Sequence, residues 1–228
     1  MTTRFDAVLF DAGGVLVLPD SAVLGPLLAY YGGSQDPADH RRAHYTGMKA
    51  KSDVDAPETE WAEYNSAYVH AIGIIDGQAD EAAEVLRRTR SAWLWREPIL
   101  ESRAALEQLS GADVPIGVVS NASGQIERVL ARSVCQVGQG PYPEVRCVVD
   151  STIVGVAKPD PSIFDHALPY FDGVDRKRIA YVGDSVTMDV GAASAAGLHP
   201  LLIDPYDLYD DPPFETVRSV AALAHELV

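Results

Sequence analysis

The chain has 228 residues, of which 47% are hydrophobic and 22% are charged, and its formal net charge is −15. Nucleic acids and anionic membranes both favour basic surfaces, so this charge argues against either as the main partner. No run reaches the roughly 20 apolar residues of a membrane-spanning helix, and the N-terminal residues lack the features of a signal peptide. Cys135 and Cys147 form neither a metal-ligand spacing nor a disulfide framework, and we expect both as buried thiols. These features favour a soluble, cytoplasmic protein.

The first predicted element is a buried strand, Ala7–Phe10, which leads into Asp11 and two glycines. The connection that follows is far longer than the dozen or so residues that a crossover between parallel strands needs. Apolar and aromatic residues recur in it at the helical period, in two series: Leu24, Leu27, Leu28 and Tyr31, then Trp61, Tyr64, Tyr68 and Ile72. We therefore expect residues 19–98 to form a small helical domain inserted after the first strand. Residues 1–18 and 99–228 would form the main domain, over which the insertion could close as a lid.

Beyond this insertion, short runs rich in Val and Ile alternate with helical patterns. Four more strands are expected, at Ile116–Val119, Arg146–Val149, Ile179–Val182 and Leu201–Ile203. Helices are expected at Leu100–Leu109, Ile126–Val134, Ser162–Tyr170, Met188–Ala196 and Thr216–Leu227. The alternation predicts an α/β fold with a doubly wound parallel sheet, in which ligands bind outside the carboxyl ends of the strands.

Polar residues stand at those predicted strand ends. Asp11 follows the first strand, Ser120 and Asn121 follow the second, and Asp184 lies just beyond the fourth, with Asp189 five residues later. Each could be a turn or helix cap when taken alone. Grouped at one edge, however, the carboxylates would repel one another without a cation, and Mg²⁺ prefers oxygen ligands. Lys158, before a proline that starts a helix, could lie in solvent or could neutralise a phosphate at the same edge.

Four motifs, FDAGGVL, VVSN, AKPDPSIF and YVGDSVTMD, occur in this order along the chain. Together they resemble the haloacid dehalogenase-like (HAD) hydrolase superfamily, specifically the subgroup with a helical cap inserted after the first motif. The resemblance spans essentially the whole chain. It implies a Rossmann-like core and a Mg²⁺-dependent reaction on a small phosphorylated substrate, through an aspartyl-phosphate intermediate.

The resemblance also implies a role for each matching residue. Asp11 would be the nucleophile, Ser120 and the backbone amide of Asn121 would bind the phosphoryl group, and Lys158 would hold nucleophile and phosphate together. The implied Mg²⁺ ligands are Asp11, the main-chain carbonyl of Gly13, and Asp184, with Asp189 supporting the metal site.

Gly13 departs from the family pattern, because most phosphatases of this family carry a second Asp two residues after the nucleophile. That residue protonates the leaving oxygen and later activates water, and such acid–base help typically contributes about 10²–10⁴-fold. Glycine keeps the backbone oxygen that would bind the metal but cannot transfer a proton.

Four functions therefore stay open: a Mg²⁺-dependent phosphatase or phosphotransferase, a carbon–halogen hydrolase, an enzyme that cleaves a carbon–phosphorus bond, and a non-catalytic module that binds a phospho-ligand. The metal-type motif around Asp184 argues against the metal-free carbon–halogen reaction. The basic run from His40 to Lys51 could be a solvated helix face or a patch that faces an anionic substrate.

Overall fold

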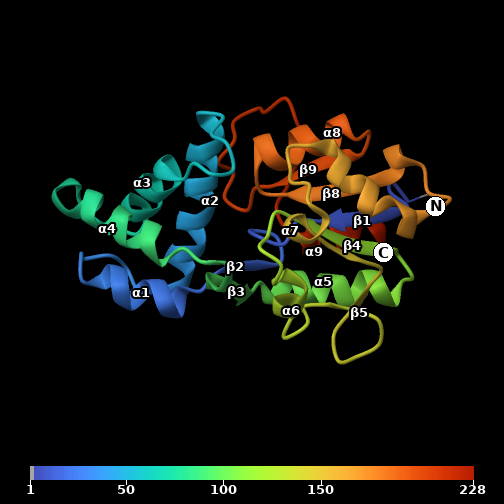
Figure 1. Ribbon diagram of the computed structural model, residues 1–228, viewed down its shortest axis with the longest axis horizontal. Coiled ribbons are helices and arrows are strands. Elements are labelled where there is room, and N and C mark those ends of the chain that lie inside the picture. Colours follow the sequence, from blue (N-terminus) through green and yellow to red (C-terminus); the bar gives the residue numbers. More distant parts are fainter. Residues whose placement is uncertain (1–2) are drawn as a thin grey trace. The chain divides into compact units, whose positions relative to one another are not determined.

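The computed structural model describes residues 3–228. Two compact units make up the chain. Met1–Val17 and Pro98–Val228 form the first, called the core unit here, and Leu18–Glu97 form the second, the helical unit (Figure 1). Within residues 3–228, no helix is both long and apolar enough to cross a membrane.

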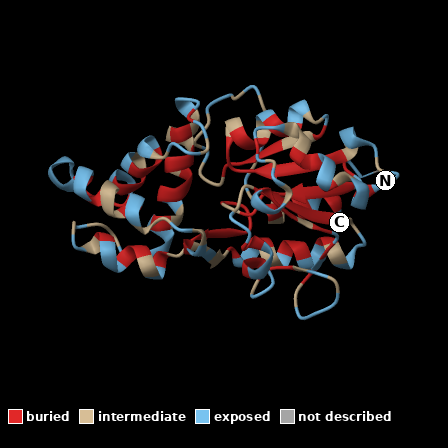
Figure 2. Cartoon of the chain, in the orientation of Figure 1, coloured by how far each residue is buried: buried red, intermediate tan, exposed pale blue. Residues whose placement is uncertain are grey.

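The core unit is built on a sheet of six parallel strands, in the order β10-β9-β8-β1-β4-β7. Along the chain they are β1 (Ala7–Phe10), β4 (Ile116–Ser120), β7 (Val148–Asp150), β8 (Ile179–Gly183), β9 (His199–Ile203) and β10 (Thr216–Val217). β1 lies between β4 and β8, and every residue of these three strands is buried (Figure 2). The predicted α/β class with a parallel sheet is confirmed.

Helices flank this sheet. They are α5 (Leu100–Gly111), α6 (Ile126–Leu130), α7 (Ser151–Val154), α8 (Ala192–Ala195) and α9 (Val220–Leu227), with 3₁₀ turns at Pro161–His166, Leu168–Phe171 and Arg176–Arg178 and a π-helix at Val186–Gly191. One apolar cluster joins strand residues such as Leu9 and Val119 to helical residues such as Phe164 and Ala193. Cys135 and Cys147 are buried free thiols, as expected. A separate two-stranded sheet pairs β5 (Gln136–Val137) with β6 (Glu144–Val145).

Several predicted elements of the core unit need correction. Thr216–Val217 is a sixth strand rather than the start of a helix, and the last helix begins at Val220, where Ser219 caps it. The segment expected as a regular helix over Ser162–Tyr170 consists of two 3₁₀ turns, Pro161–His166 and Leu168–Phe171, each with a proline near its start. The expected helix Met188–Ala196 begins as a π-helix at Val186. In each case a local hydrogen-bonding side chain or a proline overrides the apolar period.

The helical unit contains α1 (Ser21–Ala29), α2 (Pro37–Asp53), α3 (Ala62–Ala71) and α4 (Asp76–Thr89), followed by a 3₁₀ turn at Ala92–Leu94. Short strands β2 (Val17–Pro19) and β3 (Trp95–Pro98) pair with each other where the chain enters and leaves this unit. Its own apolar cluster includes Leu24, Leu28, Tyr64, Tyr68 and Leu86. A Cβ on Gly47 would lie 2.7 Å from the Tyr64 ring, so glycine allows α2 and α3 to approach closely.

The basic run on α2 is not simply a solvated face. His40, His44 and Lys51 are buried. His40 Nδ1 lies 2.7 Å from the Tyr68 hydroxyl, and His44 Nδ1 lies 3.0 Å from the Tyr64 hydroxyl. The i, i+4 spacing puts the two histidines on one face of α2, against α3. Of the two alternatives for the basic run, the solvated helix face does not hold for these three residues.

Candidate active site

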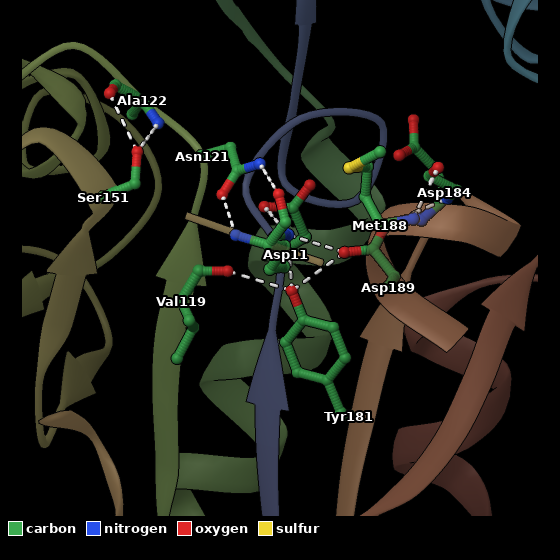
Figure 3. A network of polar contacts seen from close by, with 11 residues as sticks. Asp11, Val119, Asn121, Ala122, Ser151, Tyr181, Asp184, Met188 and Asp189 are labelled. Atoms are coloured by element: carbon green, nitrogen blue, oxygen red, sulfur yellow. Dashed lines mark hydrogen bonds and ion pairs between the residues drawn. The ribbon is translucent and has the colours of Figure 1, made fainter. Parts of the chain in front are cut away.

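The carboxyl ends of β4, β1 and β8 bring the polar residues of separate motifs together (Figure 3). Phe10 at the end of β1 pairs with Val118 of β4 and with Val182 of β8. Asp11 follows directly, and its backbone N–H donates to the carbonyl of Val182 over 2.8 Å. Parallel register alone therefore places Asp11 between the ends of the two neighbouring strands.

The loop after Asp11 is a compact turn closed by its own backbone. The N–H groups of Leu16 and Val17 both lie 2.9 Å from the carbonyl of Ala12, and the N–H of Gly14 donates to Val17. Gly14 has a φ of 66°, in the left-handed region that side chains other than glycine adopt at a cost. Gly13 lies outside that region. The backbone conformation therefore demands glycine at position 14 but not at position 13.

Lys158 is the centre of the cluster, and only 2% of its side chain is exposed. Its ammonium has three N–H groups and three oxygen acceptors nearby. Nζ lies 3.0 Å from Oδ1 of Asp11, 2.5 Å from Oδ1 of Asp189 and 2.7 Å from the hydroxyl of Tyr181. Sequence reasoning gave Tyr181 no role, although it is the first residue of the motif YVGDSVTMD. The one signal was its hydroxyl group, which is the only polar side-chain group of the strand Ile179–Gly183.

Asp189 uses both of its carboxylate oxygens within the protein. Oδ1 faces Lys158 and Tyr181, and Oδ2 accepts the backbone N–H groups of Asp184 at 3.1 Å and of Ser185 at 2.9 Å. The π-helix brings this carboxylate back over the end of β8, since Val190 N–H reaches the carbonyl of Ser185.

Gly183 makes room for that arrangement. A Cβ at this position would lie 2.2 Å from Cγ of Asp189, a distance that real atoms do not adopt without a shift of backbone or carboxylate. Asp189 therefore organises the loop that carries Asp184.

Asn121 connects the second and third motifs. Its side-chain amide nitrogen donates to the carbonyl of Lys158 over 2.9 Å, and its side-chain oxygen accepts the N–H of Lys158 over 2.8 Å. Both polar atoms of the side chain are therefore engaged in fixing the Lys158 backbone. Ser120, at the end of β4, is buried and pairs in register with Asp150 of β7.

Asp150, another strand-end carboxylate, is a structural cap. Its side chain accepts the N–H of Thr152 at the start of α7 and the N–H of Gly124 in the loop after β4. The nearby Ser151 hydroxyl bonds to both backbone groups of Ala122. These contacts hold the loop that follows Ser120 and Asn121 in one conformation.

The electrostatics of the cluster are dominated by burial. Burial raises the pKa of Asp11 to about 7, although Lys158 acts to lower it, and the charges of Asp189 and Asp184 raise it further. Burial alone lowers the pKa of Lys158, but Asp11 and Asp189 outweigh this and raise it above its ordinary value. One ammonium thus contacts two buried carboxylates, and a third, that of Asp184, lies close to both of them.

The three carboxylates could hold a metal ion. Asp11, Asp184 and Asp189 each offer an oxygen, and these oxygens all lie within 4.8 Å of one another. A set made only of oxygens suits a hard divalent cation. Because Asp189 already accepts four hydrogen bonds or ion-pair contacts, Asp11 and Asp184 are the better candidates for direct ligands.

The haloacid dehalogenase-like hydrolase family model matches residues 5–197. This match covers most of the chain, and the chain belongs to that family of hydrolases. The resemblance of the four motifs to the haloacid dehalogenase-like superfamily is therefore confirmed.

Curated relatives include a phosphatase and a dehalogenase. A haloacid dehalogenase-like hydrolase domain-containing protein 3 of Bos taurus is 30% identical over 146 residues, 63% of this chain and 55% of the relative. Pyrimidine 5'-nucleotidase YjjG of Escherichia coli (strain K12) is 26% identical, covering 60% of this chain and 63% of its own. A (S)-2-haloacid dehalogenase of Pseudomonas fluorescens is 29% identical, covering 64% and 63% respectively. The chain thus spans between about half and two thirds of the length of these relatives.

Among solved structures, the HAD hydrolase YfnB of Bacillus subtilis, crystallised with magnesium, matches with a TM-score of 0.61. The match covers 98% of this chain and 99% of YfnB at 19% identity. At this identity the likeness establishes a shared fold.

Proposed function

We propose that the chain is a Mg²⁺-dependent hydrolase of small phosphorylated substrates, with Asp11 as the nucleophile. The observation that carries the proposal is the buried contact between Asp11 and Lys158, beside the carboxylates of Asp184 and Asp189. A structural ion pair needs one carboxylate for one ammonium. Three buried carboxylates that lie close together, two of them on one ammonium, are costly to bury, and this cost is typical of a site that binds a cation and handles anionic groups.

The proposed chemistry has two steps. A carboxylate oxygen of Asp11 attacks phosphorus, and the bond from phosphorus to the leaving oxygen breaks as the acyl phosphate forms. Water then attacks phosphorus, which releases inorganic phosphate and restores the carboxylate. Lys158 offsets the charge of the nucleophile and the phosphoryl oxygens, while Ser120 and the backbone amide of Asn121 donate hydrogen bonds to those oxygens.

The donor set fits Mg²⁺, because it consists of buried carboxylates whose oxygens lie within 4.8 Å of one another. Asp11, Asp184 and the main-chain carbonyl of Gly13 would hold the ion, and Asp189 would support them by fixing the backbone of Asp184. When bound, Mg²⁺ would supply charge neutralisation and Lewis-acid polarisation.

Gly13 limits the range of substrates. Without an acid at this position, the leaving oxygen departs largely unprotonated, so acyl and aryl phosphates should react faster than alkyl phosphates.

The helical unit, predicted as a cap over residues 19–98, is proposed to select among such substrates. In that role, its amides should become protected from hydrogen exchange when a phosphate mimic such as beryllofluoride binds.

A carbon–halogen hydrolase is a second candidate. The dehalogenase branch of the family also lacks the acid that Gly13 replaces here, and one relative is a (S)-2-haloacid dehalogenase. The carboxylate group around Asp184 weighs against it, since that reaction needs no metal. Parallel assays with 2-haloacids separate the two functions.

The deciding experiment is a screen of phosphate esters with Mg²⁺ and with EDTA, using the wild type, Asp11→Asn and Asp165→Asn. Asp165 is exposed and forms a 3.5 Å surface ion pair with Arg176, so its change serves as a matched control. We expect turnover that needs Mg²⁺, that vanishes in Asp11→Asn and that persists in Asp165→Asn. Turnover in Asp11→Asn equal to the wild type, or none in the wild type on any ester, would contradict the proposal.

A further inference from the structure

Tyr181 joins three parts of the candidate site through one hydroxyl group. The hydroxyl accepts an N–H of Lys158 at 2.7 Å and lies 3.0 Å from both the carbonyl of Val119 and Oδ1 of Asp189 (Figure 3). The residue is fully buried, and its ring packs edge-on against Phe164 with centroids 4.8 Å apart. None of the four sequence motifs assigns a role to this hydroxyl.

The hydroxyl accepts one of the two hydrogen bonds that the Lys158 ammonium donates, and the other goes to Asp189. An ammonium has three N–H donors and no acceptor. Two of the three acceptors around Lys158 are the carboxylates of Asp11 and Asp189, and the third is Tyr181. The phenol can accept from Lys158 and still donate its own proton to Val119 or Asp189. Burial raises the pKa of Tyr181 well above its ordinary value, so this proton stays in place at neutral pH.

The same hydroxyl also bears on the end of β4. Val119 directly precedes Ser120, the proposed phosphate-binding residue. A bond from Tyr181 to the Val119 carbonyl therefore relates the position of Ser120 to that of Lys158 across two strands. The Tyr181 hydroxyl thus forms hydrogen bonds both to the Lys158 side chain and to the backbone of β4 at Val119.

We propose that Tyr181 is a positioning residue, which holds the Lys158 ammonium against the nucleophile Asp11 and in register with Ser120. This inference rests on the proposed function. Without the hydroxyl, Lys158 keeps only its two carboxylate acceptors. The shorter contact, to Asp189, then draws the ammonium away from Asp11, which is 3.0 Å distant.

The first test is Tyr181→Phe, which removes one oxygen and keeps the ring. Misplacement of a catalytic group by about 1 Å can cost about 10²-fold in rate, so we expect kcat to fall between about tenfold and 10²-fold. KM should change less than about twofold, because a loss confined to the transition state appears in kcat. Tyr68→Phe is the matched control, since it also removes a buried hydroxyl, 2.7 Å from His40 in the helical unit. We expect it to lower thermal stability without lowering kcat.

The second test reads Lys158 directly, without turnover. In ¹⁵N-labelled wild-type protein, the Lys158 ammonium should give a slowly exchanging signal with a nuclear Overhauser contact to the Tyr181 ring, whose centroid is 5.3 Å from Nζ. In Tyr181→Phe its exchange with water should rise by about tenfold or more, as expected when a buried donor loses its acceptor. In Tyr68→Phe it should not change.

The outcomes separate the two proposals. If no phosphate ester is hydrolysed but the ammonium signal behaves as described, the proposed function fails and the positioning of Lys158 by Tyr181 stands. If Tyr181→Phe keeps both the wild-type kcat and the protected signal, the positioning role is overturned. If Tyr181→Phe does not fold, the wild-type contact between ammonium and ring decides, and its absence overturns the inference.

Discussion

The two units of this chain both bury polar side chains, but they balance them differently. In the helical unit, ring nitrogens of His40 and His44 lie within hydrogen-bond distance of the hydroxyls of Tyr68 and Tyr64, which carry no charge. In the core unit, the ammonium of Lys158 contacts the carboxylates of Asp11 and Asp189, and the carboxylate of Asp184 lies close to both, so one positive charge accompanies three acidic groups. Fully satisfied neutral pairs stabilise a fold, whereas buried charges in excess cost stability unless a ligand completes them. The imbalance is therefore what distinguishes the candidate active site from an ordinary polar core.

Lys158→Met should break the core cluster most severely. Loss of the ammonium removes a preorganised charge, for which about 10²–10³-fold in kcat is typical. It also leaves buried carboxylates without their cation, and breaking such a pair costs about 3–5 kcal/mol of unfolding free energy. Steady-state kinetics and urea unfolding measure the two effects. Lys49→Met, which removes an i,i+4 surface pair with Asp53, should change stability by less than about 0.5 kcal/mol. Equal effects from both changes would place Lys158 among ordinary ion pairs.

Gly183→Ala should displace Asp189 without changing any charge. The new Cβ would lie 2.2 Å from Cγ of Asp189, so the carboxylate must move away from Lys158 and the backbone of Asp184. We expect kcat to fall by about 10²-fold, the scale of a misplacement by about 1 Å. Gly191→Ala lies in the same loop, where a Cβ meets nothing nearer than 3.8 Å, and should keep kcat. Wild-type kcat in Gly183→Ala would show that the position of Asp189 does not matter for the reaction.

Gly13→Asp should restore the missing acid. Because Gly13 does not need a left-handed backbone, an Asp can adopt the local conformation. In the wild type, the logarithm of the rate should depend steeply on leaving-group pKa, and the acyl phosphate on Asp11 should be trapped by acid quench. In the variant the slope should become shallower, and alkyl esters should react about tenfold faster, part of the gain that a general acid gives. A shallow slope in the wild type would mean that another group already donates the proton.

His40→Gln should have the smallest effect, a change in how the stability of the helical unit depends on pH. Burial lowers the pKa of His40, so the folded state binds its proton less readily than the unfolded chain. Stability is then lost as the pH falls below the unfolded pKa of about 6.5 and toward the lower folded value. Hydrogen exchange of α2 amides at pH 7.5 and 5.5 should show this loss in the wild type and less of it in His40→Gln. At pH 7.5 the free energy of unfolding of the variant should be lower than that of the wild type by about 1 kcal/mol, the typical net contribution of one hydrogen bond to stability. Identical pH dependence in both would exclude His40 as its source.

Sequence patterns predicted the strands well because a buried parallel strand is an uninterrupted apolar run, as in Ala7–Phe10 and Ile179–Val182. They also predicted which residues end those strands, since the end of an apolar run marks the edge of the sheet. The two-residue strand β10 was missed because Thr216 and Val217 adjoin a strongly helical segment.

The contacts within the site could not be predicted in the same way. The role of Tyr181 depends on where the Lys158 side chain ends, 23 residues away in sequence. The need for glycine at position 183 depends on a π-helix that returns Asp189 over the strand, and π-helices are too rare for local sequence to indicate. Burial of His40 and His44 depends on the tyrosines of another helix.

The three acceptors around Lys158 have a consequence for how a ligand would be recognised. Two N–H groups of this ammonium donate to Tyr181 and Asp189, and Asp11 forms an ion pair with it at 3.0 Å, so an incoming phosphoryl oxygen would compete with these three partners. Such an exchange trades one hydrogen bond for another and yields little affinity while the ligand carries its ordinary charge. The trade becomes favourable only as negative charge builds up on the phosphoryl oxygens during reaction. In the proposed function, an ammonium with these partners would thus favour the transition state over the resting substrate, which is the discrimination that accelerates a chemical step.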